Sequence, residues 1–182
     1  MTCVLEKDII DKTIDFHGHA CPGLAIGIRV SELAMQEFNI SATQSQGSSS
    51  MVCVAETDMC GVDAIQFLTN CTFGKGNLIH KDFGKSGFTF FDREQKKGFR
   101  ALFLDVKKDG QDKEARTKFI MDADLNDLFK VEKITKAPVK PAKILQSIKC
   151  EKCNEMTMES RIRRYDNKFL CIPCFMESEQ KI

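Results

Sequence analysis

Two histidines and a cysteine stand within five positions near the start of the chain, in the segment Phe16-His-Gly-His-Ala-Cys-Pro-Gly23. Because side chains two positions apart in an extended segment point the same way, His17 and His19 can converge on one ion. Pro22 is typical of a first helical turn, which places Cys21 at a helix N-terminus. The helix dipole and unpaired amides stabilise a thiolate there. The segment therefore predicts a metal site or a reactive thiol.

A second cysteine has the same predicted setting. Cys60 follows Asp58, a predicted N-cap, at the start of a helix expected over Met59–Thr69, and Asp63 lies one turn further along. If the two helix starts face each other, these side chains could form a mixed nitrogen and sulfur site for zinc, with the fourth position open for water. The candidate ligands are His17, His19, Cys21 and Cys60. An open position would make the site catalytic.

The same residues permit a structural explanation, which stays open at this point. Both histidines would then hydrogen-bond to backbone groups, and both cysteines would be small buried apolar side chains, as free cysteines often are. Cys53 fits that explanation better because it lies inside an apolar run, and nothing near Cys3 resembles a ligand set. The sequence leaves Cys71 undecided between the two explanations.

Two loops that contain glycine and lysine follow in the chain, over residues 70–77 and 82–87. Lys75 and Lys85 in these loops can meet an anionic substrate or lower the pKa of a neighbouring thiol. Neither loop contains the P-loop pattern, and Gly-Lys pairs are common in turns. We expect substrate-binding lysines here, with ordinary turn chemistry as the alternative.

The C-terminal part of the chain contains two Cys-x-x-Cys pairs separated by 17 residues. The four cysteines are Cys150, Cys153, Cys171 and Cys174. A tight turn points both thiolates of each pair at one ion, and four thiolates complete the tetrahedron that a structural zinc prefers. The hydrophobic core of a unit of this size is also too small for it to fold without a cross-link such as a bound metal ion. We therefore predict a structural zinc in this part of the chain.

The order of the cysteine pairs resembles a zinc ribbon or a treble-clef finger, of which we favour the treble clef. It would contain a knuckle at Cys150, a hairpin around Arg161 to Asn167, and a short helix after the second pair. Arg161, Arg163 and Arg164 could bind phosphates. Six acidic residues share the module, so nucleic-acid binding is the less favoured interpretation and partner docking stays open.

Composition excludes several classes of protein. Hydrophobic residues make up 42% and charged residues 29% of the chain, as in a globular protein. No apolar run is long enough for a membrane helix, and the first residues lack a signal-peptide pattern, so we expect a cytoplasmic protein. Nine cysteines are an odd number, which favours metal ligands or reactive thiols over a disulfide framework.

Charge and proline content divide the chain in two. Residues 1–135 carry 17 basic and 20 acidic side chains, whereas residues 136–182 carry 10 and 6. A stretch with two prolines and three lysines separates them. We predict a core domain over 1–135, a linker over 136–148 and a zinc finger over 149–182.

Apolar periodicity predicts a mixed α and β core. The expected helices run over Cys3–Lys12, Pro22–Phe38, Met59–Thr69 and Glu114–Lys130, and the expected strands over Met51–Ala55, Gly87–Phe91 and Phe99–Val106. The last two strands should pair as a hairpin, with their phenylalanines in the core.

Three motifs together resemble those of the FmdE family, which is named for formylmethanofuran dehydrogenase. They are Phe-His-Gly-His-x-Cys-Pro-Gly at residues 16–23, Cys-x-x-Asp-Ala-Ile-Gln at 60–66 and Cys-Thr-Phe-Gly-Lys-Gly-Asn at 71–77. The resemblance covers residues 1 to about 130, and the finger is similar to an appendage that many members carry. It implies an α+β, thioredoxin-like core with a mixed sheet flanked by helices, commonly paired as a homodimer.

The resemblance also implies where the site lies. It points to His17, His19, Cys21 and Cys60 as the active site, holding zinc or iron, with Asp63, Lys75 and Lys85 around it. The family takes its name from association with a molybdenum or tungsten oxidoreductase complex, whose large subunits perform the oxidation. The present chain has no molybdopterin-sized domain and cannot be that dehydrogenase by itself.

Two hypotheses follow from the sequence. In the first, the His-Cys cluster is a metal or thiol site that serves anaerobic one-carbon or redox metabolism. In the second, the chain is a non-catalytic subunit that docks a larger complex, or binds nucleic acid, through its finger.

Overall fold

The computed structural model describes residues 3–41, 50–105, 112–141 and 143–180. Contacts between Cα atoms divide the chain into two units, Met1–Pro141 and Ala142–Ile182. Within the described residues, no helix combines the length and the apolar character needed to cross a membrane.

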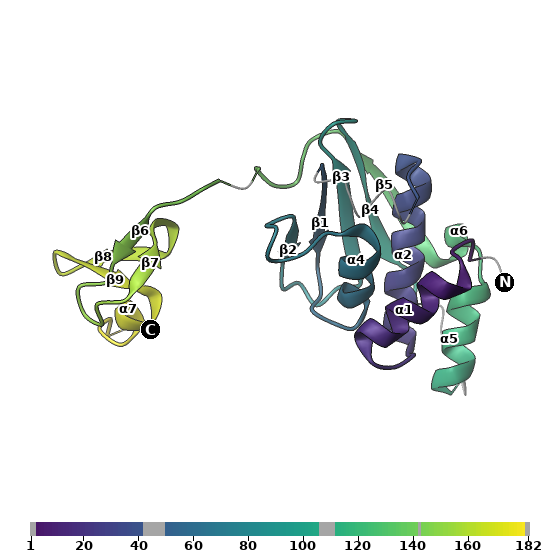
Figure 1. Ribbon diagram of the computed structural model, residues 1–182, viewed down its shortest axis with the longest axis horizontal. Helices are drawn as coiled ribbons and strands as arrows, with labels where there is room; N and C mark the ends of the chain where they lie inside the picture. Colours follow the sequence, from purple (N-terminus) through teal and green to yellow (C-terminus); the bar gives the residue numbers. More distant parts are fainter. Residues whose placement is uncertain (1–2, 42–49, 106–111, 142, 181–182) are drawn as a thin grey trace. The chain divides into compact units, whose positions relative to one another are not determined.

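A five-stranded sheet forms the centre of the first unit (Figure 1). Its strands are β1 (Met51–Ala55), β2 (Leu78–His80), β3 (Gly87–Asp92), β4 (Lys97–Phe103) and β5 (Phe129–Ile134), in the order β2-β1-β3-β4-β5. β1 and β2 pair in parallel, and the other neighbours pair antiparallel. β1 is buried along its whole length, as its unbroken apolar run predicts. The sheet is therefore mixed, as expected.

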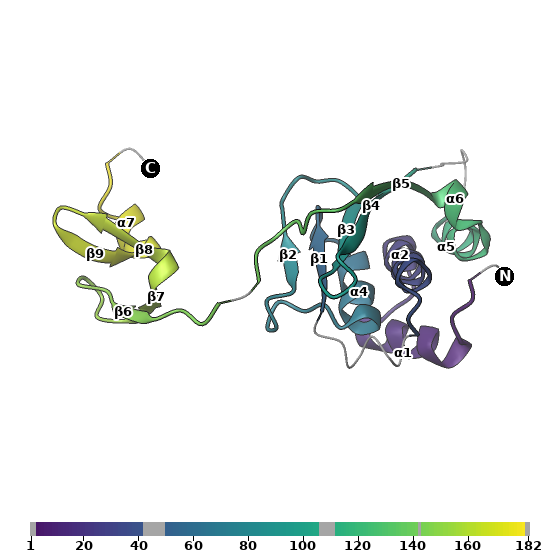
Figure 2. The ribbon, with the colours of Figure 1, turned by 90° about the horizontal axis from the view of Figure 1, so that it is seen from above.

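Helices cover one face of this sheet. They are α1 (Lys7–His17), α2 (Pro22–Phe38), α4 (Gly61–Thr69), α5 (Lys113–Asp122) and the short α6 (Leu125–Leu128). Figure 2 shows α4, α2 and α5 along the sheet, with α1 on the side of α2 and α4 that faces away from it. The predicted α+β architecture, a mixed sheet flanked by helices, is confirmed.

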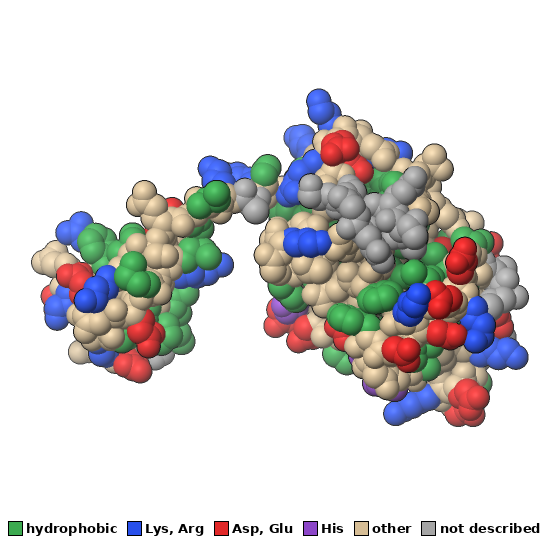
Figure 3. Space-filling model, in the orientation of Figure 1, with side chains coloured by type: hydrophobic (Ala, Val, Ile, Leu, Met, Phe, Trp, Pro, Cys, Tyr) green, Lys and Arg blue, Asp and Glu red, His purple; other side chains and the backbone are tan. Residues whose placement is uncertain are grey.

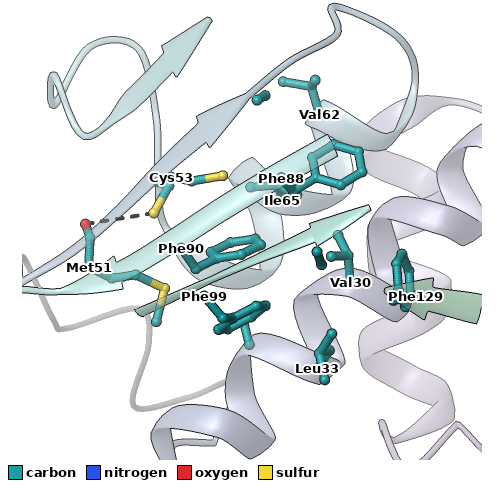
Figure 4. Close-up of a cluster of buried hydrophobic side chains, with 14 of the residues drawn as sticks. Val30, Leu33, Met51, Cys53, Val62, Ile65, Phe88, Phe90, Phe99 and Phe129 are labelled. Carbon is teal, nitrogen blue, oxygen red and sulfur yellow. Dashed lines mark hydrogen bonds between the residues drawn. The ribbon is translucent and has the colours of Figure 1, made fainter. Parts of the chain in front are cut away.

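The main core lies between the sheet and this layer of helices. Phe90 of β3 stands opposite Phe99 of β4, with ring centroids 5.6 Å apart. Phe38 of α2 packs on Phe99 at 5.7 Å. Figure 4 shows Val30 and Leu33 of α2 on the side of the sheet that carries the rings of Phe90 and Phe99. The predicted place of the phenylalanines in the core is confirmed.

The backbones of α2 and α4 touch at two glycines. A Cβ built at Gly27 would lie 2.2 Å from the carbonyl oxygen of Gly61, which no real side chain tolerates. A Cβ at Gly23, one turn earlier, would lie 3.2 Å from the Cβ of Cys60. Glycine therefore lets the two helix starts meet, and their N-cap residues are Cys21 and Cys60.

The first helix lies later in the chain than the sequence predicts. α1 spans Lys7–His17, whereas the apolar pattern indicated Cys3–Lys12. The backbone N–H of Val4 donates to the buried Glu32 Oε1 at 2.9 Å. The first described residues are therefore bound to α2 instead of forming a helical turn of their own.

The predicted helix Glu114–Lys130 is wrong beyond Asp122, where α5 ends. The side chain of Asp124 accepts a hydrogen bond from the Asn126 N–H at 2.8 Å and begins α6. The chain then extends as β5 and pairs with β4. Phe129, whose spacing fits the helical pattern, thus belongs to strand β5. Pairing with β4 supplies the backbone hydrogen bonds that favour this strand.

The hairpin predicted from the phenylalanine-rich segments is confirmed as β3 and β4. β4 begins at Lys97, two residues before its predicted start, and ends at Phe103. The predicted end, Val106, lies outside the described residues. β2 has no counterpart among the predicted strands, because three residues are too few to give a periodic pattern.

An ion pair fixes the chain where β1 ends. Arg100 Nε donates to Glu56 Oε1 at 2.6 Å, and Arg100 Nη2 donates to Oε2 at 2.8 Å. A Cβ at Gly87 would lie 2.9 Å from both side chains, so glycine makes room for the pair. The hydrogen bonds from Arg100 lower the pKa of Glu56. The pair anchors the loop that leads from β1 to Cys60.

The second unit consists of short elements. They are β6 (Ser147–Lys149), β7 (Met156–Met158), the 3-10 turn η1 (Glu159–Arg161), β8 (Ile162–Tyr165), β9 (Lys168–Cys171) and α7 (Ile172–Met176). β6 and β7 pair, and β8 and β9 form the predicted hairpin. Leu170 and three of the cysteines form the small core of this unit. The rings of Tyr165 and Phe175 pack against this core, with their centroids 5.7 Å apart. The order of knuckle, hairpin and helix is that of a treble-clef finger.

Replacing Gly27 with Ala should destabilise the first unit, because the new methyl group would overlap the Gly61 carbonyl. Overpacking of this kind costs about 1–3 kcal/mol, measurable as a lower urea midpoint. The control is Gly74→Ala, since a Cβ at Gly74 would meet nothing within 4 Å. Equal midpoints for the two variants would contradict the glycine contact.

Replacing Glu56 with Gln should flatten the acid dependence of stability. Because Arg100 holds the folded-state pKa of Glu56 below its ordinary value of 4.5, the ionised carboxylate stabilises the fold above that pH. This stabilisation is lost as the pH falls through the lower, folded-state pKa. Urea midpoints between about pH 6 and pH 3 measure the effect. The exposed Glu94→Gln variant should retain the wild-type slope, and an unchanged slope in Glu56→Gln would refute the assignment.

Candidate metal centres

Three of the predicted ligands meet at one end of the first unit. One ligand atom from each of His17, His19 and Cys21 lies within 4.8 Å of the others. The two imidazole rings are 4.7 Å apart between centroids, and His17 Nε2 lies 3.9 Å from the Cys21 sulfur. Figure 3 shows that histidine side chains reach the surface of this unit.

The histidines converge through a helix end instead of an extended segment, so that part of the prediction is wrong. His17 is the last residue of α1, and Gly18 ends the helix with φ +95°. The Gly18 N–H donates to the Ile14 carbonyl at 2.7 Å. This left-handed turn is the usual helix C-cap of glycine, and it reverses the chain so that His19 lies beside His17.

Cys21 occupies the predicted helix start. It is the N-cap of α2, with Pro22 in the first turn, and its sulfur accepts a hydrogen bond from the Leu24 N–H at 3.3 Å. A backbone donor and the positive end of a 17-residue helix both stabilise negative charge on this sulfur. Cys21 is therefore well placed to act as a metal ligand.

Cys60 lies next to Cys21 across the glycine contact. A Cβ at Gly23 would lie 3.6 Å from the Cys60 sulfur and 4.0 Å from the Cys21 sulfur. Burial raises the pKa of Cys60, and so do the neighbouring Cys21 thiol and the charge of Asp63. A free thiolate pair would be unfavourable here, whereas a bound cation would relieve the repulsion.

The start of α4 differs from the prediction by two residues. The helix begins at Gly61 with Cys60 as its N-cap, and Asp58 makes no cap. The reason is a turn before the helix, in which the Thr57 hydroxyl accepts a hydrogen bond from the Met59 N–H at 3.3 Å. The shift moves Cys60 from the first turn of the helix to its boundary.

Asp63 contacts the His17 ring at the nitrogen that does not face Cys21. Asp63 Oδ2 lies 2.7 Å from His17 Nδ1, and the other carboxylate oxygen accepts a hydrogen bond from Gln66 Nε2 at 3.4 Å. With its proton on Nδ1, His17 donates to the carboxylate and keeps a lone pair on Nε2, the atom that faces Cys21. A carboxylate behind a histidine is the usual second partner of a metal-binding imidazole.

The two predicted lysines have different surroundings. Lys75 Nζ donates to Asn70 Oδ1, and Asn70 is the C-cap of α4, at the other end of the helix from Cys60. The described contacts therefore do not bring Lys75 to the histidines. The backbone N–H of Lys85 donates to the Glu56 carbonyl at 3.0 Å, in the loop that leads to Cys60.

Sequence reasoning missed two contributors to this cluster. Gln66 follows Asp63 by three residues on α4, which is the spacing at which helix side chains meet. Gly23 and Gly27 stand four apart and face Gly61, directly after Cys60. This spacing of small residues was the available signal for a close helix contact.

The other cysteines of the first unit are structural. Cys53 and Cys71 are fully buried and Cys3 is 8% exposed. Burial raises the pKa of Cys71 to about 11 and that of Cys53 well above its ordinary value. The expectation that Cys3 and Cys53 pack as apolar side chains is confirmed, and Cys71 joins them.

The second unit brings all four of its cysteines together. Their sulfurs lie within 4.8 Å of one another, and those of Cys153 and Cys171 are 3.9 Å apart. Four sulfurs bound to one zinc at about 2.3 Å stand about 3.8 Å from each other. The separation therefore fits zinc.

Electrostatics in this cluster also favours a cation. Backbone amides of Cys153 and Cys171 lower the pKa of Cys150 to about 6. The pKa of Cys174 is raised because the neighbouring thiols compete with it for negative charge. Four crowded sulfurs, one of them readily ionised, are stabilised by a divalent ion at their centre.

Comparison with known proteins agrees with this geometry. The FmdE family, described as molybdenum formylmethanofuran dehydrogenase operon, matches residues 16–154. The chain belongs to the FmdE family. The prokaryotic dksA/traR C4-type zinc finger matches residues 143–180, so this FmdE-family chain also contains a four-cysteine zinc finger. It is a metal-binding protein.

Two similar proteins extend the comparison. A crystal structure of a tungsten formylmethanofuran dehydrogenase FmdE-like protein from Syntrophus aciditrophicus has a TM-score of 0.65 and 24% identity, covering 97% of this chain and 94% of that one. It shares the fold. A protein of Archaeoglobus fulgidus named a probable S-adenosyl-L-methionine-binding protein is 30% identical over 189 aligned positions, 88% of this chain and 50% of the relative. The chain thus spans about half the length of that relative.

Replacing Cys153 with Ser should remove the structural zinc, because three thiolates and a hydroxyl bind the ion more weakly than four thiolates. Elemental analysis should show one zinc fewer per chain, and amide hydrogen exchange should become fast in the second unit alone. Cys3→Ser removes a thiol that is not a ligand and should retain all zinc. Full zinc in Cys153→Ser would contradict the assignment.

Proposed function

We propose that His17, His19, Cys21 and Cys60 hold a second metal ion and that this site is the working centre of the protein. The observation that carries the proposal is the line from Asp63 through His17 to Cys21, with separations of 2.7 Å and 3.9 Å. An imidazole nitrogen and a thiolate on one tetrahedral zinc stand about 3.6 Å apart. Zinc and iron both suit this mixed donor set.

Each side chain has a separate role in the proposed site. Asp63 fixes the tautomer and orientation of His17. Cys21 supplies one sulfur at the α2 N-terminus, and Cys60 supplies a second sulfur next to it. Exposed His19 stands on the solvent side, where a substrate would enter. When bound, the ion would polarise a substrate carbonyl or lower the pKa of a water molecule.

Family membership supports the place of this site in metabolism. The family description refers to the formylmethanofuran dehydrogenase operon, so we infer a role in anaerobic one-carbon or redox metabolism, as an accessory component of a molybdenum or tungsten oxidoreductase complex. The proposal includes a homodimer with a thioredoxin-like core, which the resemblance implies. Lys85, on the loop beside Glu56, is the better candidate of the two lysines for an anionic substrate.

A second candidate function is docking through the zinc finger. Arg163 and Arg164 are exposed, and in the described structure their side chains bond only to groups one and three residues away, the Ile162 carbonyl at 3.0 Å and Asn167 Oδ1 at 3.4 Å. Exposed Phe169 stands opposite Arg164 in the hairpin. Such a surface suits a protein or phosphate partner. Deleting residues 138–182 should abolish docking and leave the core site intact.

Metal content per chain tests the main proposal. Elemental analysis of anaerobically purified protein should give two metal ions in the full chain and one in a chain that ends at Ala137. His19→Ala should lose the core ion and retain the finger zinc. One ion in the full chain and none in the shortened chain would refute a second metal site.

Replacing Asp63 with Asn should weaken binding at the core site without removing a ligand. Loss of an outer partner of a metal-binding histidine typically lowers affinity about 10–100-fold. Competition with a chelator of known affinity measures the change. Asp58→Asn, which alters an exposed carboxylate near the same helix start, should bind as the wild type does. Equal affinity in both variants would show that Asp63 does not support the site.

A further inference from the structure

Cys21 and Cys60 are the two accessible thiols of the first unit. Both are partly exposed, whereas Cys3, Cys53 and Cys71 are buried. Next to them lies Met59, 65% exposed, so the approach from solvent is open on that side. A small reagent can therefore reach these two sulfurs and not the other three.

The backbone brings these two thiols close together. Gly23 leaves the space between them empty of any side chain, since its own Cβ would lie 3.6 Å from one sulfur and 4.0 Å from the other. The contact between Gly27 and Gly61 brings the two helix starts as close as their backbones allow. The two sulfurs are thus neighbours that belong to segments 39 positions apart in the sequence.

We propose that Cys21 and Cys60 form a reversible disulfide, which makes this pair a redox modification site. The disulfide itself depends only on the two thiols and their surroundings. Its consequence rests on the proposed function: oxidation removes two of the four ligands, so the core metal ion leaves.

The reaction requires an external oxidant, and a small-molecule disulfide such as oxidised glutathione is the class that fits a partly open site. The Cys21 sulfur, which accepts a hydrogen bond from the Leu24 N–H, gives its proton to water and attacks one sulfur of the oxidant. A mixed disulfide forms and one small thiolate leaves. The Cys60 thiol gives its proton to water and attacks the Cys21 sulfur, which releases the second small thiolate. Two electrons pass from the protein to the oxidant, and reduction by excess thiol reverses both steps.

The remaining cysteines are protected from the same reaction by different means. Cys53 and Cys71 are inaccessible and their pKa values are raised, so they form little thiolate. The four finger sulfurs surround a structural zinc on which their unit's small core depends, so their loss to oxidation also requires that unit to open. The partly exposed cysteines Cys21 and Cys60 can therefore be compared with the buried Cys53 and Cys71 in the same protein.

The test treats the full, zinc-loaded chain with oxidised glutathione and maps the linked peptides by mass spectrometry. We expect a loss of two thiols and a peptide that joins Cys21 to Cys60, reversed by reduced glutathione. Cys60→Ser should stop at the mixed disulfide on Cys21, whereas Cys21→Ser should react far more slowly. Cys71→Ala is the matched control and should oxidise as the wild type does.

Two results would overturn the proposal. One is a linked peptide that contains other cysteines, and the other is a wild-type reaction in both Cys21→Ser and Cys60→Ser. The His19→Ala variant separates this proposal from the metal site: the disulfide should still form there, even though the variant does not hold the core ion. If His19→Ala oxidises and wild type contains no core metal, the disulfide stands and the proposed metal function fails.

Discussion

The contact between the backbones of α2 and α4 is the constraint on which the rest of the first unit depends. Without a side chain at Gly27 and Gly61, the two helices approach until carbonyl and Cα atoms touch. This approach brings two N-caps together and thereby two sulfurs from distant parts of the sequence. The sheet beneath sets the direction of both helices, and α1 only has to end at the correct place for the histidines to join the sulfurs.

The two cysteine clusters differ in how much the fold needs a metal ion. The first unit has a large apolar core of its own, with phenylalanines from three strands and α2 at its centre. None of the four His-Cys ligands belongs to that core, so its apolar contacts are made without them. The second unit has a core of four residues, three of which are ligands. There the ion replaces the missing hydrophobic contacts, as in other small zinc modules.

Sequence patterns predicted the elements that have strong periodicity or sharp boundaries. The bounds of α2 and β1 were predicted to the residue, because Pro22 marks one start and the apolar run of β1 lies between polar neighbours. The patterns failed where tertiary contacts decide: the N-terminal segment binds Glu32, and Phe129 joins a sheet although its spacing suits a helix.

The candidate site was predictable in composition and unpredictable in detail. Residue types alone named both histidines and both cysteines. Only the structure shows that Asp63 contacts His17. No local sequence pattern predicts that α4 lies next to the end of α1. The position of Lys75 shows the opposite case: a motif that is close in sequence to Cys60 is separated from it by the length of a helix.

The last strand of the sheet has a consequence for how the protein behaves at high concentration. β5 is an edge strand, and an unpaired edge is a template on which a second molecule can add a strand. Lys130, Glu132 and Lys133 are exposed along β5, and Lys130 Nζ lies 3.0 Å from Glu132 Oε1. Charged side chains interspersed with apolar ones make sheet extension from this edge costly. The edge is thus protected against uncontrolled sheet extension by its own sequence.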